Sequence, residues 1–488
     1  MQRENFKSRL GFILVSAGCA IGIGNVWKFP YICAAYGGAA FIVIYLIFLA
    51  LLGLPLLITE FAIGRGSGKS IVSAYNVLGS AESKFQKNRY AGLVGNYLLM
   101  AFYSMVCGWM VDYTYKSVSG SLSGLDTGEV AGVFTTMLGN TGEMSLFTIL
   151  AIVVAFGICA LGLNKGVEKI TNIIMMTLFV LMIILAVNSC TLDRAAEGLK
   201  YYLVPDFSKI SENGTGNVLF TAMSHAFFTL SIGVGSMLIF GSYLKKDRKL
   251  TGESLNIVLL DTLIALIAGL IIIPACVSFD VPLNSGPSLL FISLPNVFNV
   301  MPGGRIWMSM FFVFMTFAAL STMIAVFENI IAMCMELSGW SRRKTVAVNI
   351  PLMIILSMPA VLGFNVLSGI NPLGGESTLM DLEDFIVSNN VLPLGSLTML
   401  LFCTQKYGWG WDNFIKEVNT GNGRQLTPKL RFYMTWILPA IIITVYLKGY
   451  WDYFENYSIT VRVATMAIAV ALLAIIFDEK KRKHISAI

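Results

Sequence analysis

The sequence Gly18-Cys-Ala-Ile-Gly-Ile-Gly-Asn25 lies in the middle of an apolar stretch that runs from Leu10 to Ala35 and carries one charged residue, Lys28. A stretch of this length and composition predicts a membrane-spanning helix. Its glycines and its asparagine, however, weaken a helix and leave backbone polar groups without partners. Inside a bilayer such a break is tolerated only where it is buried in protein or lines a polar cavity. We therefore expect a broken helix that contributes to a site.

A second stretch, Phe228-Thr-Leu-Ser-Ile-Gly-Val-Gly-Ser236, interrupts another uncharged apolar run in the same way. The string Ile-Gly-x-Gly thus occurs twice, at 21–24 and 232–235. Paired interruptions are typical of the substrate site at the midplane of a transporter. Two other interpretations stay open: the spacing of Gly18 and Gly22 also favours close helix packing, and basic residues before an apolar run also occur in signal peptides. The duplication favours a binding site.

The composition places the chain among integral membrane proteins. Of 488 residues, 56% are hydrophobic and 13% are charged, and the mean hydropathy is +0.74. The net charge of +6 does not indicate nucleic-acid binding, because the basic residues lie in short segments between apolar runs. Eight cysteines lie in or beside apolar runs without metal-like spacing, so we expect them to be reduced and structural.

Apolar stretches predict twelve membrane-spanning helices and hence an all-α fold. They cover residues 9–35, 39–65, 90–117, 144–162, 168–189, 217–244, 252–278, 304–336, 344–363, 378–403, 429–447 and 458–477. If the N-terminus is cytoplasmic, 26 of the 34 Lys and Arg residues lie in cytoplasmic segments. This bias predicts that both termini are cytoplasmic.

The positions of the two breaks divide the chain into corresponding parts. We expect residues 1–202 to form a first repeat of five helices, residues 203–405 a second repeat, and residues 406–488 the last two helices and a cytoplasmic tail. An odd number of spans per repeat inverts the second copy in the membrane. Such inverted repeats support alternating access to a site at the midplane.

Three segments carry a resemblance to a known family: Arg9-Leu-Gly through Gly-Asn-Val-Trp-Lys-Phe-Pro-Tyr31, Phe227–Gly235, and Ala318-Ala-Leu-Ser-Thr322. They resemble the neurotransmitter:sodium symporter family, in particular bacterial amino-acid members such as LeuT. The resemblance implies a LeuT-type fold, a 5+5 inverted repeat with helices 1 and 6 unwound at mid-membrane. It also implies symport of sodium with a small-molecule substrate.

Sodium is a hard cation that prefers oxygen ligands, which broken helices supply as free carbonyls. The resemblance implies two sodium sites. The first would use Ala20, Asn25, Thr229 and Asp261, and the second Gly18, Ile21, Ala318, Ser321 and Thr322. Animal members generally need chloride beside the first site. Asp261 would supply that negative charge permanently, so we expect no chloride requirement. The other interpretations are a protonated structural aspartate and hydroxyls bonded to their own helix.

A substrate carboxylate suits the half-helix N-terminus at Gly22 and Gly24, whose amides point free. The resemblance implies that the Tyr103 hydroxyl also holds this carboxylate and that the amine rests on Ala20, Phe228 and Thr229, with Ser231 nearby. Monoamine members carry Asp where this chain has Gly22, so we expect an amino acid. The side-chain pocket would be lined by Leu99, Val234, Thr322 and Val326.

Val234 is smaller than the Phe of LeuT, which favours a bulky aliphatic or aromatic side chain in the substrate. The alternative is that Val234 and Val326 only pack the core.

Four charged residues are candidate gates. Lys28 and Asp384 match an outer pair, and Arg3 and Glu336 resemble a cytoplasmic pair. Lys28 could instead snorkel to the interface, and Arg3 could act only as a topology signal. The resemblance further predicts that Glu60 hydrogen-bonds the broken part of helix 6. For Glu328 we expect a structural hydrogen bond.

These observations predict a sodium-coupled importer of neutral, hydrophobic or aromatic L-amino acids. No zinc-protease motif or serine-based constellation suggests an enzyme. A sodium-dependent receptor or sensor and an ion channel are the alternatives, although no filter segment for a channel is evident. The loop at 119–143 lacks the cysteine pair of animal relatives, so we expect a prokaryotic plasma (inner) membrane protein embedded in the lipid bilayer. The sequence does not predict an oligomeric state.

Overall fold

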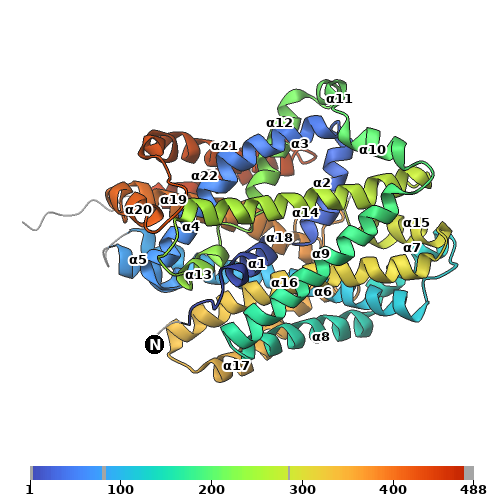
Figure 1. Cartoon of the computed structure of the whole chain (residues 1–488), viewed down its shortest axis with the longest axis horizontal. Coiled ribbons are helices and arrows are strands. Elements are labelled where there is room, and N and C mark those ends of the chain that lie inside the picture. The colour runs from blue at the N-terminus through green and yellow to red at the C-terminus, as the bar shows by residue number, and fades with distance from the viewer. Residues whose placement is uncertain (1–3, 80–83, 284–285, 478–488) are drawn as a thin grey trace, which may run out of the picture.

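The computed structural model describes residues 4–79, 84–283 and 286–477, and helices dominate it (Figure 1). No strand occurs in these ranges; one isolated bridge joins Arg248 and Asn422. The prediction of an all-α fold is therefore confirmed.

Ten described helices are long and apolar enough to cross a membrane, and the bent pair α1 and α2 counts as an eleventh span. The predicted sixth span consists of two separate helices of 14 and 7 residues, α12 and α13. The two interrupted spans are the two that the glycine motifs predict. The ten continuous spans differ from their predicted ranges only at their ends.

The spanning helices have the following bounds, given in chain order. Those of the first half are α1 (Arg9–Ala20), α2 (Ile23–Ala35), α3 (Ala39–Phe48) with α4 (Leu54–Ser67), α6 (Asn88–Ser119), α8 (Thr141–Ala160) and α9 (Lys169–Cys190). Those of the second half are α12 (Thr215–Phe228), α13 (Ser236–Ser242), α14 (Leu250–Ser278), α16 (Gly304–Ser338), α17 (Arg342–Leu362), α18 (Leu379–Ile386) with α19 (Leu392–Thr404), α21 (Leu438–Tyr453) and α22 (Ile459–Phe477).

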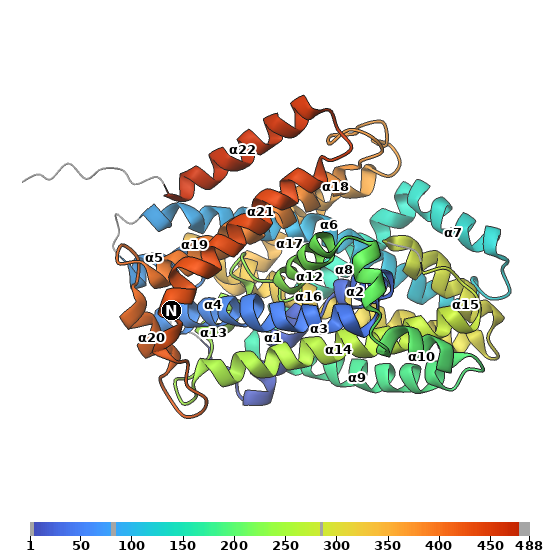
Figure 2. The ribbon, with the colours of Figure 1, turned by 90° about the horizontal axis from the view of Figure 1, so that it is seen from above.

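Short helices lie in the connections between the spans. These are α5 (Ile71–Leu78), α7 (Thr127–Gly139), α10 (Ala195–Leu203), α11 (Phe207–Glu212), α15 (Leu294–Val300) and α20 (Trp411–Val418). In both views α5 and α20 lie at one end of the molecule, whereas α7, α10 and α15 lie at the other (Figures 1 and 2). The spans therefore run roughly along the long axis between two sets of connecting helices.

Burial distinguishes the centre of the bundle from its edge. The most apolar window of α16 is 72% buried, and α1 lies beside it near the centre (Figure 1). By contrast, the corresponding window of α22 is 6% buried, and this helix stands at the periphery (Figure 2). The interrupted helices thus occupy the protein interior, where free backbone groups can find partners.

The first break occupies two residues. α1 ends at Ala20, α2 begins at Ile23, and the two axes differ by 57°. Gly22 precedes α2 in an extended conformation, and its N–H donates to the Asn25 side-chain oxygen at 3.3 Å. Asn25 therefore satisfies one of the amides that the break frees, as a side chain in the first turn of a helix often does.

The second break is longer because its backbone alternates in handedness. Ser231, Gly233 and Gly235 have φ angles of +51°, +107° and +78°. Positive φ values are incompatible with a right-handed helix, and glycine adopts them without steric cost. The chain therefore leaves the helix at Thr229 and re-enters it at Ser236.

Candidate functional site

The two breaks meet each other in the interior. The Ser231 hydroxyl, on the second break, donates to the carbonyl of Cys19 at 3.1 Å, just before the first break. Ser231 is half-buried and Cys19 is fully buried. Backbone groups from both interrupted spans thus converge on one region.

A first oxygen cluster joins three elements. The buried Asp261 carboxylate of α14 accepts hydrogen bonds from Asn25 Nδ2 at 2.8 Å and from Thr229 Oγ1 at 3.0 Å. The Ala20 carbonyl oxygen lies 4.0 Å from the position that a Cβ on Gly22 would take. The structure therefore brings together Asn25, Thr229 and Asp261, three of the four residues predicted for the first ion. Carboxylate, amide and hydroxyl oxygens are the ligands that a hard cation prefers.

A second oxygen cluster contains all five residues predicted for the second ion. Ser321 Oγ lies 3.1 Å from the Gly18 carbonyl and 2.9 Å from the Ala318 carbonyl. Thr322 Oγ1 lies 3.2 Å from each of the Gly18 and Ile21 carbonyls and 3.4 Å from that of Ala318. Both hydroxyls can rotate to offer lone pairs to a cation, since each donates only one hydrogen. The cluster ties α1 to α16.

Two hydroxyls line the space beside Gly22. A Cβ on Gly22 would lie 3.3 Å from Tyr103 Oη and 3.4 Å from Thr322 Oγ1. Tyr103 Oη is buried and has no hydrogen-bond partner among the described residues. Gly24 is exposed, and a Cβ there would meet nothing within 4 Å. Asn25 accepts from the Gly22 N–H, so the amides that follow it at the N-terminus of α2, next to an unused hydroxyl, are the ones suited to a carboxylate.

The residues predicted to line a side-chain pocket come from α6, the second break and α16. Val234 and Val326 are fully buried, whereas Leu99 is half-buried; Phe228, predicted beside the amine, is also half-buried. A Cβ on Gly95 would lie 3.5 Å from Val234 Cγ1, so this side chain leans on α6.

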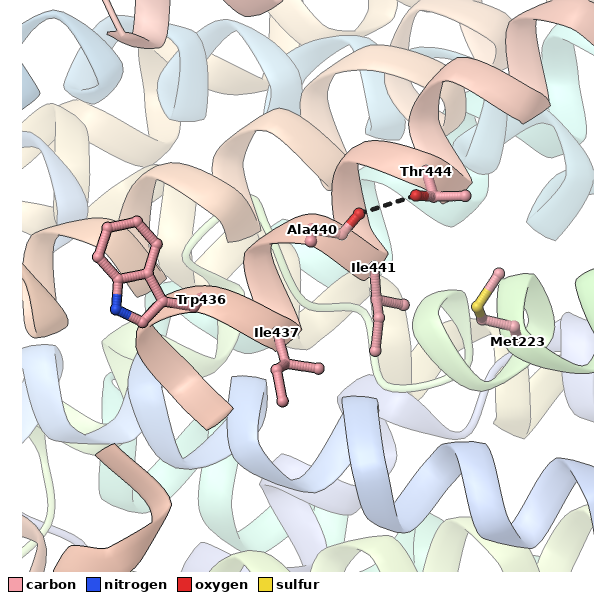
Figure 3. A pocket seen from close by; sticks show the side chains of 6 residues that line it. All are labelled: Met223, Trp436, Ile437, Ala440, Ile441 and Thr444. Atoms are coloured by element: carbon pink, nitrogen blue, oxygen red, sulfur yellow. Dashed lines mark hydrogen bonds between the residues drawn. The ribbon is translucent and has the colours of Figure 1, made fainter. Parts of the chain in front are cut away.

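A cavity of about 400 Å³ lies away from the breaks, between α12 and the start of α21 (Figure 3). Apolar side chains dominate its lining, and its Trp436 is 67% exposed. It is a surface groove, and none of its lining residues belongs to the clusters described above.

Glu60 braces the second break. Its buried carboxylate accepts hydrogen bonds from the N–H groups of Gly233 and, at 3.2 Å, Leu238. α4 and α13 pack closely here: a Cβ on Gly64 would lie 1.9 Å from the Leu238 carbonyl oxygen. The predicted contact between Glu60 and the broken helix is confirmed.

The outer pair is not in contact. Lys28 and Asp384 are both exposed, and no ion pair within 4.0 Å joins them in the described chain. The Asp384 carboxylate instead accepts a hydrogen bond from Ser388 at 2.7 Å. The exposed Gly24 and Lys28 lie on the same helix, so this face of α2 is open.

On the side predicted to be cytoplasmic, charged residues in the interior form a network. Glu328, whose side chain is fully buried, pairs with Arg342 at 2.6 Å and accepts a hydrogen bond from the Tyr243 hydroxyl at 2.9 Å. Phe6 packs edge-on against the Tyr243 ring. Glu336 accepts from the Ser70 amide and hydroxyl. Its predicted partner Arg3 lies outside the described residues.

Replacement of Arg342 by alanine is expected to lower the melting temperature in detergent, because it strands the Glu328 carboxylate in the interior. Removing one partner of a buried ion pair costs about 3–5 kcal/mol. The double variant Glu328→Gln/Arg342→Ala should recover most of the loss. Equal melting temperatures for the single variant and the wild type would contradict the prediction.

Sequence reasoning missed several buried polar residues. In the sequence, Arg342 is only one of the 34 Lys and Arg residues whose distribution predicts the topology. Asn96, Ser236 and Asn329 are fully buried, and the Asn96 side-chain oxygen accepts a hydrogen bond from each of the other two. An asparagine inside an apolar helix is itself a signal, because a buried amide needs partners.

A family model described as the Sodium:neurotransmitter symporter family matches residues 3–130 and 128–478. The chain belongs to this family. Members of the sodium:neurotransmitter symporter family are secondary transporters and not enzymes, so this chain is a multi-pass, sodium-dependent transporter of a small-molecule substrate.

Similar members of the family include two bacterial proteins. An uncharacterized sodium-dependent transporter, YhdH of Bacillus subtilis, is 34% identical over 91% of this chain and 97% of its own length. An uncharacterized sodium-dependent transporter of Haemophilus influenzae is 30% identical over 92% of this chain and 98% of its own length. The crystal structure of MhsT in complex with L-phenylalanine superposes with a TM-score of 0.81 at 34% identity, covering 91% of this chain and 99% of that one. This structural match confirms the predicted LeuT-type symporter fold.

Proposed function

We propose that this symporter imports neutral, hydrophobic or aromatic L-amino acids with two sodium ions, by alternating access and without chloride. The observation that carries the proposal is the convergence of both breaks on two oxygen clusters beside Gly22 and Tyr103. A transporter that works by alternating access encloses its substrate at such a site, whereas a channel needs a continuous pore.

The first sodium ion is assigned to Ala20, Asn25, Thr229 and Asp261. The Asp261 side chain accepts hydrogen bonds from Asn25 and Thr229, which favour its ionised form, and in that form it places a negative charge at the site. A fixed anion at this position compensates the charge of the ion, which removes the need for chloride.

The second sodium ion is assigned to Gly18, Ile21, Ala318, Ser321 and Thr322. The close approach of two hydroxyls to three carbonyls supports this assignment.

The substrate carboxylate is assigned to the amides of Gly22 and Gly24 and to the Tyr103 hydroxyl. The lack of a partner for Tyr103 Oη supports the assignment, although the Gly22 N–H itself donates to Asn25. The amine is assigned to Ala20, Phe228, Thr229 and Ser231, although the Ser231 hydroxyl is itself bonded to Cys19. The side chain is assigned to a pocket lined by Leu99, Val234, Thr322 and Val326. MhsT binds L-phenylalanine, which supports an aromatic or hydrophobic substrate.

The organisation follows from the same proposal. Residues 1–202 and 203–405 are inverted repeats, residues 406–488 add the last two helices and the tail, and both termini face the cytoplasm of a prokaryote. Lys28 and Asp384 form the outer gate when they approach each other. Arg3 and Glu336 contribute to the inner gate.

A thermal-shift screen of the twenty amino acids tests this function. In sodium chloride and in sodium gluconate, a preferred hydrophobic or aromatic amino acid should raise the melting temperature equally, because ligand at 100 times its Kd stabilises by about 2.7 kcal/mol. In potassium chloride the shift should vanish. A shift that persists in potassium contradicts sodium coupling, and one that needs chloride contradicts the role of Asp261.

Uptake into proteoliposomes separates the alternatives. Sodium-driven accumulation is expected for a symporter. Sodium-dependent binding without accumulation would identify a sensor, and single-channel currents without substrate would identify a channel.

A further inference from the structure

Three fully buried polar side chains from three helices meet where the second break ends. Asn96 of α6 accepts hydrogen bonds at its Oδ1 from Ser236 Oγ of α13 at 3.2 Å and from Asn329 Nδ2 of α16 at 3.0 Å. Its Nδ2 donates to the carbonyls of Gly92 at 2.7 Å and Val234 at 2.9 Å. We refer to Asn96, Ser236 and Asn329 as the amide cluster.

Each member of the amide cluster lies next to a residue assigned to the side-chain pocket. Leu99 follows Asn96 by three residues, and Val326 precedes Asn329 by three. Residues three apart share a helix face and are separated by about 4.5 Å along the axis. On the third element Val234 precedes Ser236 by two residues. With the orientation proposed above, all three members lie on the cytoplasmic side of their pocket neighbours.

The position of Val234 is fixed at two points. Asn96 holds its carbonyl, and its side chain leans toward Gly95. A Cβ on Gly95 would also lie 2.4 Å from Val391 Cγ1, so Val391 packs against α6 at the same glycine. The hydrogen bond from Asn96 and the contact at Gly95 therefore both hold Val234 against α6.

We propose that Asn96 is a specificity-determining positioning residue: through the amide cluster it forms the floor of the side-chain pocket and sets how long a substrate side chain can be. The inference rests on the proposed amino-acid transport. Asn96 does not touch substrate; it acts by holding Val234, Ser236 and Asn329 together. Without its amide, the Val234 carbonyl loses a donor and the floor opens toward the cytoplasm.

Competition binding in sodium tests the floor. Leucine, phenylalanine and tryptophan are titrated against one labelled amino acid on the wild type, on Asn96→Ala and on the milder Ser236→Ala, which removes a single hydrogen bond. We expect Asn96→Ala to move the ratio of tryptophan to leucine affinity in favour of tryptophan by about tenfold, the size of effect that pocket shape usually has. Ser236→Ala should move it less and in the same direction.

Asn349→Ala is the matched control. Asn349 is also a buried asparagine beside α6, where it accepts from Tyr97 and donates to the Thr345 carbonyl, but it does not contact the break. This variant should keep the wild-type affinity ratio even if its melting temperature falls. Equal losses for all three amino acids in Asn96→Ala and Ser236→Ala would overturn the inference and leave a structural role. A wild type without sodium-dependent binding would overturn the proposed function itself.

Discussion

Replacement of Gly233 by alanine is expected to abolish sodium-dependent uptake in proteoliposomes. Gly233 has a φ of +107°, and its added Cβ would lie 2.2 Å from the Leu392 carbonyl oxygen and 2.7 Å from Leu392 Cα. Both are backbone atoms of α19, so neither can rotate away. The positive φ and the overpacking together cost about 2–5 kcal/mol. The strain acts on the segment whose N–H groups donate to Glu60. We therefore expect the backbone of the second break to be displaced.

Gly216→Ala provides the control for this prediction. Gly216 lies in the first turn of α12, ahead of the same break, and a Cβ there would meet nothing within 4 Å. Alanine at such a position leaves stability unchanged or raises it slightly. Wild-type uptake by Gly233→Ala would show that the second break is not held in the conformation described here.

Replacement of Asp261 by asparagine is expected to weaken the apparent affinity for sodium by about 10–100-fold in chloride-free medium, because a hydrogen-bonded buried charge contributes about 1.5–3 kcal/mol. The amide keeps the size of the side chain but removes the negative charge that compensates the ion. Chloride should restore part of the lost affinity by supplying the missing anion. Sodium titrations of amino-acid uptake in gluconate and in chloride measure both effects.

Asp280→Asn is the matched substitution outside the site. Asp280 follows the end of α14, its side chain is 78% exposed, and it pairs with Arg194. It should leave the sodium titration unchanged. A variant Asp261→Asn that keeps wild-type affinity in gluconate would remove Asp261 from the first sodium site.

Both breaks could be predicted from the sequence because their cause is local. Glycines, an asparagine and a serine interrupt apolar runs, and positive φ values at Ser231, Gly233 and Gly235 explain why the second interruption is the longer one. The assembly of the clusters is not local: Asn25 and Asp261 are 236 residues apart. Their proximity could be inferred only from the resemblance to a family, and the structure agrees with it.

Two aspects of the site could not be read from the sequence. Whether Lys28 contacts Asp384 depends on which conformation of the transporter is present, and one sequence encodes all of them. The role of Arg342 was hidden because a basic residue beside a span serves equally as a topology signal. Only its distance to Glu328 distinguishes the two roles.

The Thr322 hydroxyl belongs to both halves of the site: it contacts the Gly18 and Ile21 carbonyls and also lies beside Gly22. The binding of an ion on one side and of a solute on the other therefore both depend on the orientation of the Thr322 O–H bond. Thermodynamic reciprocity follows: whatever factor the cation contributes to the affinity for the solute, the solute returns to the cation. One rotatable hydroxyl thus offers a route by which the energy of an ion gradient is converted into accumulation.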